Sequence, residues 1–252
     1  MDLPADAGHL RLDELLVSRG LFATRSRARD AILRGAVSVD ARKARKAGQM
    51  VPASAEIAVD DPAGAYVSRA ALKLIHGLDA FGFDPAGCVC LDIGASTGGF
   101  TQVLLERGAA RVLAVDVGHG QLAPALAADP RVSSMEGLNA RQLDAAALAG
   151  AVPDMIVCDV SFISVRLALP PALALAAPGA QAVILVKPQF EVGRDGIGKG
   201  GLVAPRRAEA AAREVRDWLA LQPGWRPVGL VASPIAGGDG NAEFLLGGVR
   251  QA

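Results

Sequence analysis

Four charged side chains lie beside apolar runs of strand length, where they could carry out acid–base chemistry. Asp159 and Lys187 each follow such a run, and Glu243 opens another. Lys73 lies on a segment of helical pattern ahead of the first run. Because open α/β sheets bind ligands at the carboxyl ends of their strands, we expect the four residues to share one rim. Two lysines and two acids there can form alternating ion pairs that leave one lysine as a base, or they can be purely structural.

A glycine-rich segment, Leu91–Thr101, carries a second chemical signal. Its pattern predicts a buried strand that ends at Ile93, a turn of small residues, and a helix that starts at Gly98 and Gly99. Glycines let a backbone approach a ligand where a Cβ would collide. Any strand-to-helix connection can need such a turn, so the glycines alone do not identify the ligand.

Two carboxylates around this turn favour one class of ligand. Asp92 precedes the first glycine, where it would repel a pyrophosphate but attract a cationic sulfonium and its amino-acid moiety. Asp116 ends the next apolar run, where a carboxylate can accept hydrogen bonds from two ribose hydroxyls. The structural alternatives are that Asp92 stabilises the turn and that Asp116 caps a helix. We therefore predict S-adenosylmethionine as the cofactor, with Asn139 and Glu136 as candidates to face its adenine. The predicted cofactor-binding residues are Asp92, Gly94, Ala95, Ser96, Gly98, Gly99, Phe100, Asp116, Val117 and Asn139.

The elements around these residues alternate between strands and helices. Such alternation predicts an α/β domain, a mostly parallel seven-stranded Rossmann-like sheet with helices on both faces. We expect the last two strands to form an antiparallel pair at one edge. The predicted strands are Val89–Ile93, Val112–Val117, Arg131–Met135, Met155–Val160, Ala182–Val186, Val228–Ala232 and Glu243–Val249.

The N-terminal region follows a different pattern, that of a compact α+β unit. Leucines at helical spacing from Leu12 predict a helix that Gly20 ends, and Thr24 or Ser26 can cap a second helix. Short strands are expected at Ala36–Val39 and Ile57–Val59. We therefore divide the chain into a small domain over residues 1–61, a linker over 62–66 and a large domain over 67–252.

The small domain concentrates positive charge in a chain whose formal net charge is zero. Nine basic residues fall between Arg19 and Lys46, against only Asp30 and Asp40. This is typical of a protein that binds a phosphate backbone, whereas the alternative is a merely solvated helix face. The face of the second helix that carries the arginines has no interleaved acids, which argues against that alternative. The predicted RNA-binding residues are Arg11, Arg25, Arg27, Arg29, Arg42, Lys43, Arg45 and Lys46, with Arg69 and Lys199 in the large domain.

Composition excludes several classes of protein. Hydrophobic residues make up 51% of the chain, but no apolar run reaches the roughly 20 residues that span a bilayer. Asp2, Pro4 and Asp6 do not form a signal peptide, so we expect a cytoplasmic protein, and a monomer by default. The cysteines at 88, 90 and 158 fit no zinc spacing, and we expect buried, reduced thiols and no metal.

The segment Glu191–Val203 contains five glycines together with Arg194 and Lys199. It is not a phosphate-binding P-loop, because the required spacing and a Ser or Thr after the lysine are absent. We interpret it as a flexible basic loop beside Lys187 that orders on RNA.

The small domain resembles an S4 RNA-binding domain. The likeness lies in three stretches: Arg11–Leu16, Thr24–Ala28 and Ile32–Val39. The Asn-Gly turn usual in that family is Asp40-Ala41 here, which affects the geometry of the turn.

The whole chain resembles the TlyA family, haemolysin-like proteins known as ribosomal RNA 2′-O-methyltransferases, whose large domain is of the FtsJ type. The matching stretches are Tyr66–Leu74, Leu91–Thr101, Ala114–Leu122, Asp159–Ser164, Leu185–Glu191, Ser233–Ile235 and Gly240–Leu245. Ala70-Ala71 replaces a usual glycine pair.

The resemblance makes Lys73, Asp159, Lys187 and Glu243 a catalytic tetrad. It implies methylation of a cytidine ribose 2′-hydroxyl in ribosomal RNA, on the large subunit and in some members also the small one. Our hypothesis makes Lys187 the base and Asp159 the residue that holds it, with the other two positioning it. Phe162 could stack on the substrate nucleotide, but we favour a place for it in the core.

Three other functions remain open. The chain could be an RNA-binding or ribosome-assembly factor without catalysis, although all four tetrad positions are intact. It could be a membrane-lysing haemolysin, but it has no spanning segment and no amphipathic membrane stripe. A methyltransferase for a small molecule or a protein would leave the basic domain unexplained. We expect neither a membrane nor DNA as a partner.

Overall fold

The structure is a computed structural model that describes residues 8–251. The prediction based on Asp2, Pro4 and Asp6 lies outside these residues. The chain divides into two compact units, one up to Ala65 and one from Tyr66 onward. Each unit is built around its own hydrophobic core.

The first unit is the small α+β fold that the sequence indicates. Leucines of its first helix pack against Ile32 and Val37 in the core. Gly20 ends that helix in the left-handed conformation at φ +71°, and the Thr24 hydroxyl accepts a hydrogen bond from Arg27 N to cap the next one. Its elements are β1 (His9–Arg11), α1 (Leu12–Ser18), α2 (Arg25–Leu33), β2 (Val37–Val39), β3 (Arg42–Lys43), β4 (Met50–Pro52), β5 (Ile57–Val59) and a 3₁₀ turn at Pro62–Ala65.

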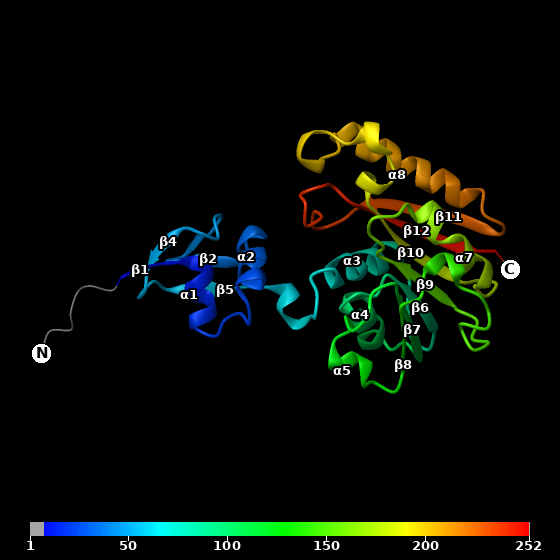
Figure 1. Cartoon of the computed structure of the whole chain (residues 1–252), viewed down its shortest axis with the longest axis horizontal. Coiled ribbons are helices and arrows are strands. Elements are labelled where there is room, and N and C mark those ends of the chain that lie inside the picture. The colour runs from blue at the N-terminus through cyan, green and yellow to red at the C-terminus, as the bar shows by residue number, and fades with distance from the viewer. Residues whose placement is uncertain (1–7, 252) are drawn as a thin grey trace, which may run out of the picture. The chain divides into compact units, whose positions relative to one another are not determined.

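The second unit has the predicted alternation of strands and helices (Figure 1). Its strands are β6 (Val89–Ile93), β7 (Arg111–Asp116), β8 (Val132–Glu136), β9 (Met155–Cys158), β10 (Gln181–Val186), β11 (Trp225–Ala232) and β12 (Phe244–Arg250). Its helices are α3 (Ala71–Phe81), α4 (Gly99–Glu106), α5 (Pro124–Ala127), α6 (Val165–Ala168), α7 (Pro170–Leu175) and α8 (Pro205–Ala220).

All seven strands form one sheet in the order β11-β12-β10-β9-β6-β7-β8. Strands β6 to β10 are parallel, and β12 pairs antiparallel with both β10 and β11. The predicted antiparallel pair at one edge is thus confirmed. Parallel strands place their carboxyl ends at one edge of the sheet, and β12 begins at that edge because it runs the other way.

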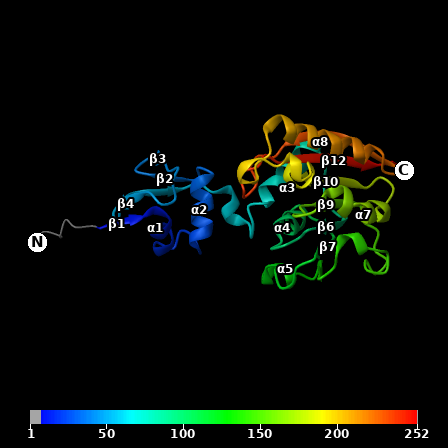
Figure 2. The same cartoon turned by 45° about the horizontal axis from the view of Figure 1, so that its top comes forward.

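Helices cover both faces of this sheet. Helices α3 and α4 pack on one face, and α6, α7 and α8 pack on the other. In the turned view, α8 runs alongside β12 (Figure 2). Successive residues of a strand point to opposite faces. In β6, Leu91 and Ile93 therefore face α6–α8, whereas Cys90 faces α3 and α4. Asp92 has the same parity as Cys90 and lies on the α4 side.

Several strand ends differ from prediction by one or two residues. The strand predicted to reach Val160 ends at Cys158, so Asp159 and Val160 lie beyond the sheet edge. The apolar pattern continues because Val160 still packs partly on the core. Likewise β7 ends at Asp116, and Val117 is 69% exposed. Of the three cysteines, Cys90 and Cys158 are buried as predicted, Cys88 only partly.

Candidate active site

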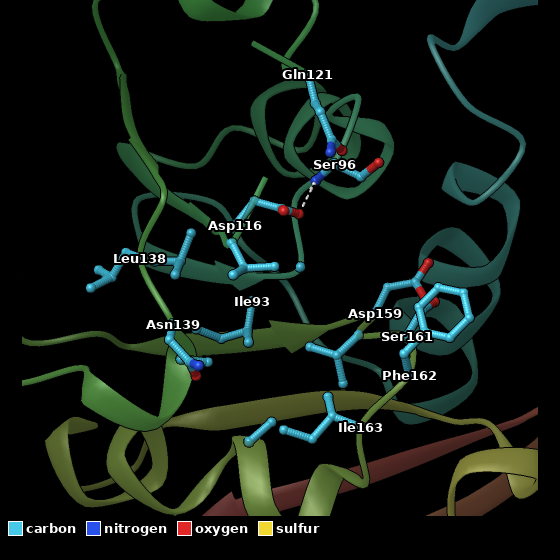
Figure 3. Close-up of a pocket in the computed structure, with 16 residues that line it drawn as sticks. Ile93, Ser96, Asp116, Gln121, Leu138, Asn139, Asp159, Ser161, Phe162 and Ile163 are labelled. Carbon is cyan, nitrogen blue, oxygen red and sulfur yellow. Dashed lines mark hydrogen bonds between the residues drawn. The ribbon is translucent and has the colours of Figure 1, made fainter. Parts of the chain in front are cut away.

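The turn after β6 is held by Asp116 at the end of β7. Oδ2 of Asp116 accepts a hydrogen bond of 2.8 Å from Ser96 N, and Oδ1 accepts one of 2.7 Å from Gly118 N. Asp116 and Ser96 both line a pocket of about 470 Å³ (Figure 3). Each carboxylate oxygen can still accept a second hydrogen bond, so the carboxylate can also receive hydroxyl groups of a ligand.

The larger pocket extends between two groups of residues. In Figure 3, Leu138 and Asn139 lie at one end, and Asp159, Ser161 and Phe162 lie at the other. The Asn139 side chain accepts a hydrogen bond of 3.1 Å from Arg141 N, which fixes its place at the pocket wall. A volume of this size, with mainly apolar walls and a few polar groups, suits a nucleoside.

A second, smaller pocket adjoins the first and shares part of its wall. Its volume is about 140 Å³, and it contains Lys187, Ser68 and the turn after β6. Four residues line both pockets: Gly94, Ser96, Asp159 and Ser161. Of the predicted cofactor-binding residues, Val117 lines the larger pocket, whereas Ala95, Gly99 and Phe100 line the smaller one. Asp92 and Gly98 line neither of the two pockets.

Asp92 is fully buried beneath the turn, on the side of α4. Its Oδ2 accepts a hydrogen bond of 2.7 Å from the Thr101 hydroxyl. Burial raises the pKa of Asp92 to about 7, and the nearby charges of Asp159 and Asp116 act in the same direction while the Thr101 hydrogen bond opposes them. The structure therefore gives Asp92 a direct role in the turn, and its contact with a cofactor remains a prediction.

The glycines of the turn are required by contacts within the protein. A Cβ on Gly94, which has φ +85°, would lie 2.8 Å from the Asp159 carbonyl oxygen. A Cβ on Gly99 would lie 2.9 Å from Ser68 Cβ, where the start of α4 meets the segment before α3. The structure therefore gives these glycines a packing role, and their close approach to a cofactor remains a prediction.

Glu136, considered as a partner for adenine, has another role. Its carboxylate accepts hydrogen bonds from the backbone amides of Gly120, Gln121 and Leu122, at 2.6, 3.0 and 3.3 Å. These amides hold the pKa of Glu136 below its usual range. Glu136 thus fastens the loop that follows Asp116.

The four tetrad residues come together as two ion pairs. Lys73 Nζ lies 2.6 Å from Glu243 Oε2, and Lys187 Nζ lies 2.6 Å from Asp159 Oδ1. The topology explains the second pair, since Asp159 and Lys187 follow the adjacent parallel strands β9 and β10. Glu243 joins them because Phe244 of β12 is paired with Val186 of β10.

The pairs lie at the rim and are largely shielded from water. The side chains of Lys73 and Glu243 are 7% and 3% exposed, and those of Lys187 and Asp159 are 10% and 14% exposed. Lys187 and Asp159 line the smaller pocket, so their pair faces the space next to the turn.

Two residues that the sequence reasoning did not select complete the arrangement around Lys187. The Lys187 ammonium donates a hydrogen bond of 2.7 Å to Ser161 Oγ. The buried carboxylate of Glu191 accepts hydrogen bonds from Ser164 Oγ, Val165 N and Arg166 Nε, at 2.6, 2.8 and 3.2 Å. Both follow apolar strands in polar stretches, but only the fold shows that their segments face each other.

Phe162 is 91% exposed, so the core position favoured from the sequence is wrong. Its backbone has φ +65°, a conformation that is uncommon outside glycine and directs the ring outward. The ring lies near that of Phe190, with centroids 5.4 Å apart, at the mouth of the larger pocket.

The glycine-rich segment 191–203 is less free than expected. It contains 3₁₀ turns at Arg194–Gly196 and Lys199–Gly201, and Asn241 fastens its end. Asn241 is 2% exposed, accepts a hydrogen bond of 2.8 Å from Val203 N and donates one of 2.9 Å to Gly201 O. The segment is thus tied to the loop that precedes Glu243.

The basic residues of the first unit fall into two groups. Arg11 and Arg25 pair with Asp13 and Glu14 of α1, so acids do neutralise part of the face that was expected to lack them. Arg34 likewise pairs with Asp30 and Asp61. A second group is exposed and, within residues 8–251, forms no salt bridge: Arg29, Arg42, Lys43, Arg45 and Lys46. Arg27 is also exposed.

In the second unit, Lys199 is exposed and Arg69 is partly buried. The Arg69 guanidinium lies against the loop that precedes Glu243, where it would contact a Cβ on Gly238. Among the described residues, no group of three His, Cys, Asp or Glu side chains could hold a metal ion. The part of the chain that the structure describes also contains no helix with the length and apolarity to cross a membrane.

Comparisons with known proteins agree with this architecture. Residues 66–250 match the family model for FtsJ-like methyltransferases, and residues 10–57 match that for the S4 domain. The 16S/23S rRNA (cytidine-2′-O)-methyltransferase TlyA of Mycobacterium tuberculosis is 46% identical over 95% of this chain and 90% of its own length. Hemolysin A of Brachyspira hyodysenteriae is 38% identical over 94% of this chain and 98% of its own.

A solved structure of a hemolysin candidate from Streptococcus thermophilus has the same fold. It superimposes with a TM-score of 0.71 at 38% identity, over 97% of this chain and 90% of that one. The similarity therefore extends over both units and not only over the cofactor turn.

Proposed function

We propose that this chain, which belongs to the FtsJ-like methyltransferase family, methylates the ribose 2′-hydroxyl of a cytidine in ribosomal RNA. The methyl donor is S-adenosylmethionine. The pockets suit this donor: Asp116 offers a carboxylate for ribose hydroxyls, and apolar residues such as Leu138 and Ile163 flank the space for a base. The adjoining smaller pocket leaves room for the amino-acid part beside the turn.

The observation that carries the proposal is the place of Lys187. Its amine lies beside Asp159 and lines the pocket that adjoins the proposed cofactor site. Methyl transfer to an alcohol needs the oxygen close to the methyl carbon and a group that removes its proton. An amine can bind a hydroxyl and accept its proton, which supports Lys187 as the base.

The reaction follows from these positions. S-adenosylmethionine supplies a methyl group on a positively charged sulfur, which is a good leaving group. Methyl transfer would release this sulfur as the neutral thioether of S-adenosylhomocysteine, and Lys187 would take the proton that the 2′-hydroxyl loses as its oxygen receives the methyl group. Asp159 stabilises the ammonium that results, and the pair of Lys73 and Glu243 supports the rim beside it.

The substrate class rests on the first unit and on Phe162. Exposed cations that no acid neutralises fit the phosphate backbone of RNA. An exposed aromatic ring at the mouth of the pocket suits a base that is turned out of its stack. We further propose that the protein acts in the cytoplasm as a monomer on ribosomal subunits.

Methyl transfer from tritiated cofactor to ribosomal RNA, as naked RNA, subunits and ribosomes, tests the proposal. We expect label in 2′-O-methylcytidine, and loss of that label with Lys187→Ala while S-adenosylhomocysteine still binds. Asp116→Ala should instead lose cofactor binding. RNA binding without any transfer would favour a non-catalytic assembly factor, and normal turnover of Lys187→Ala would refute its role as base.

A further inference from the structure

The Lys187 amine has two short contacts, and both involve the segment that follows β9. Asp159 Oδ1 lies 2.6 Å and Ser161 Oγ 2.7 Å from Nζ. Asp159 belongs to the tetrad, but Ser161 has no role in the mechanism above. It is exposed, and it lines both pockets.

The tetrahedral geometry of an amine means that these two contacts determine where the lone pair of Nζ points. A neutral amine carries two N–H bonds and one lone pair, arranged tetrahedrally, whereas an ammonium carries three N–H bonds and no lone pair. Ser161 Oγ accepts one N–H, and the Asp159 carboxylate lies in ion-pair contact with Nζ and repels a lone pair. In the neutral amine the lone pair must then point in a direction that neither oxygen occupies, and Lys187 has its exposed surface in the smaller pocket.

We propose that Ser161 is a positioning residue that, together with Asp159, directs the lone pair of Lys187 at the acceptor hydroxyl. This inference rests on the proposed function. When the hydroxyl proton moves to Nζ, the lone pair becomes the third N–H bond of the ammonium, and the contacts with Asp159 and Ser161 persist. The amine therefore does not rotate during the step.

The backbone around Ser161 is held firmly enough for such a role. Three residues further on, Ser164 and Val165 donate hydrogen bonds to the buried Glu191 carboxylate. On the other side, Asp159 N donates to Ile93 O at 2.9 Å. The segment is thus fixed at both ends, and the Ser161 hydroxyl has a defined place beside Lys187.

Ser161 contributes little to the fold itself. Its side chain is exposed, and its hydrogen bond to Lys187 is its one side-chain hydrogen bond among the described residues. Replacing an exposed side chain usually changes stability very little. A loss of turnover on its removal would therefore report on orientation of the amine and not on unfolding.

The test compares Ser161→Ala with Ser161→Thr, which keeps the hydroxyl, and with Ser134→Ala as an exposed serine of β8 away from the pockets. We expect Ser161→Ala to lower kcat roughly 10- to 100-fold, part of the effect of a positioned base. The KM for RNA and the Kd for S-adenosylhomocysteine should stay within about twofold of wild type, since neither depends on the lone pair of Lys187. Ser161→Thr should keep most of the activity, and Ser134→Ala all of it.

Three results would overturn the inference. Ser161→Ala with a wild-type kcat would show that Asp159 alone orients the amine. A loss in Ser161→Thr as large as in Ser161→Ala would show that shape matters and the hydroxyl does not. A wild-type protein that transfers no methyl group to any ribosomal RNA would refute the proposed function, and this role of Ser161 with it.

Discussion

Lys73 Nζ and Glu243 Oε2 lie 2.6 Å apart in a setting almost closed to solvent, although one residue belongs to helix α3 and the other precedes the final strand. The free-energy cost of removing two charges from water is often larger than the gain from their mutual attraction. A buried ion pair is therefore weak evidence of stabilisation. The position of this ion pair beside Lys187 and Asp159 suggests instead that the pair fixes the shape of the sheet edge and the electric field there.

Breaking this pair should be far more harmful than replacing it. We expect Lys73→Ala to lower the free energy of unfolding by about 3–5 kcal/mol, because it leaves the Glu243 carboxylate buried without a partner. The double variant Lys73→Met with Glu243→Met should recover most of that loss but not methyl transfer. Urea denaturation and the transfer assay check this, and a single variant as stable as wild type would contradict it.

The buried Asp92 carboxylate predicts a pH dependence of stability. Its pKa in the folded protein, about 7, is above the value of 3.8 expected when unfolded, so the folded state binds more protons between these two pH values. The contribution of Asp92 to the free energy of unfolding is therefore largest below about pH 4, decreases as the pH rises to about 7, and is constant at higher pH. The whole loss is roughly 4 kcal/mol for a shift of about three pKa units.

Replacing Asp92 with Asn isolates this effect. Asn cannot ionise, so the difference in unfolding free energy between Asp92→Asn and wild type, both without cofactor, should grow in favour of the variant from pH 4 to pH 7. Urea unfolding in buffers of constant ionic strength measures it. If the difference stayed constant over this range, Asp92 would not be the buried acid that its surroundings indicate.

Phe162 offers a test that separates substrate contact from folding. Because the ring is exposed, Phe162→Ala should change the free energy of unfolding by less than about 0.5 kcal/mol. Loss of a stacking partner should nevertheless reduce kcat/KM for RNA by roughly tenfold or more, since one base–aromatic stack is worth about 1–3 kcal/mol. Phe162→Trp should retain activity. Equal activity of the Ala variant would exclude stacking.

The two groups of basic residues should respond differently to substitution. Removing the four exposed cations at positions 42, 43, 45 and 46 together should weaken RNA binding. It should also reduce the slope of log K against log[salt] by about 0.7–0.9 for each lost phosphate contact. Arg34→Ala should chiefly lower stability, because Arg34 holds Asp61. Filter binding across a salt series, with thermal unfolding in parallel, distinguishes the two. An unchanged slope in the fourfold variant would place the RNA elsewhere.

The sheet was predictable because its strands are long, apolar and separated by helical patterns. The short strands His9–Arg11, Arg42–Lys43 and Met50–Pro52 were not, since two or three residues carry no detectable alternation and form only through pairing with distant partners. The salt bridges of Arg25 with Asp13 and Glu14 also depend on tertiary structure, because they join two helices and do not follow from spacing within the second helix.

The tetrad, with Asp159 holding Lys187, could be named from the sequence through family resemblance, but the contact between Lys73 and Glu243 could not. The place of Glu243 depends on the register of β12 against β10, a property of tertiary structure. Ser161, Glu191 and Asn241 were missed because each acts across a gap in sequence: Ser161 bonds to Lys187, 26 residues away, and Asn241 bonds to Gly201, 40 residues away. Phe162 was misplaced because its apolar character suggests burial, whereas its backbone conformation turns it outward.

Strand β12 is the last strand in the chain, yet it lies between β10 and β11. A nascent chain cannot fill this gap, and cannot bring Glu243 to Lys73, until residue 250 has left the exit tunnel. The sheet of the second unit can therefore close only after β12 has been made, because long-range pairing of this kind has no local substitute. A chain that is still being made thus lacks a complete tetrad until Glu243 and the strand after it have been added.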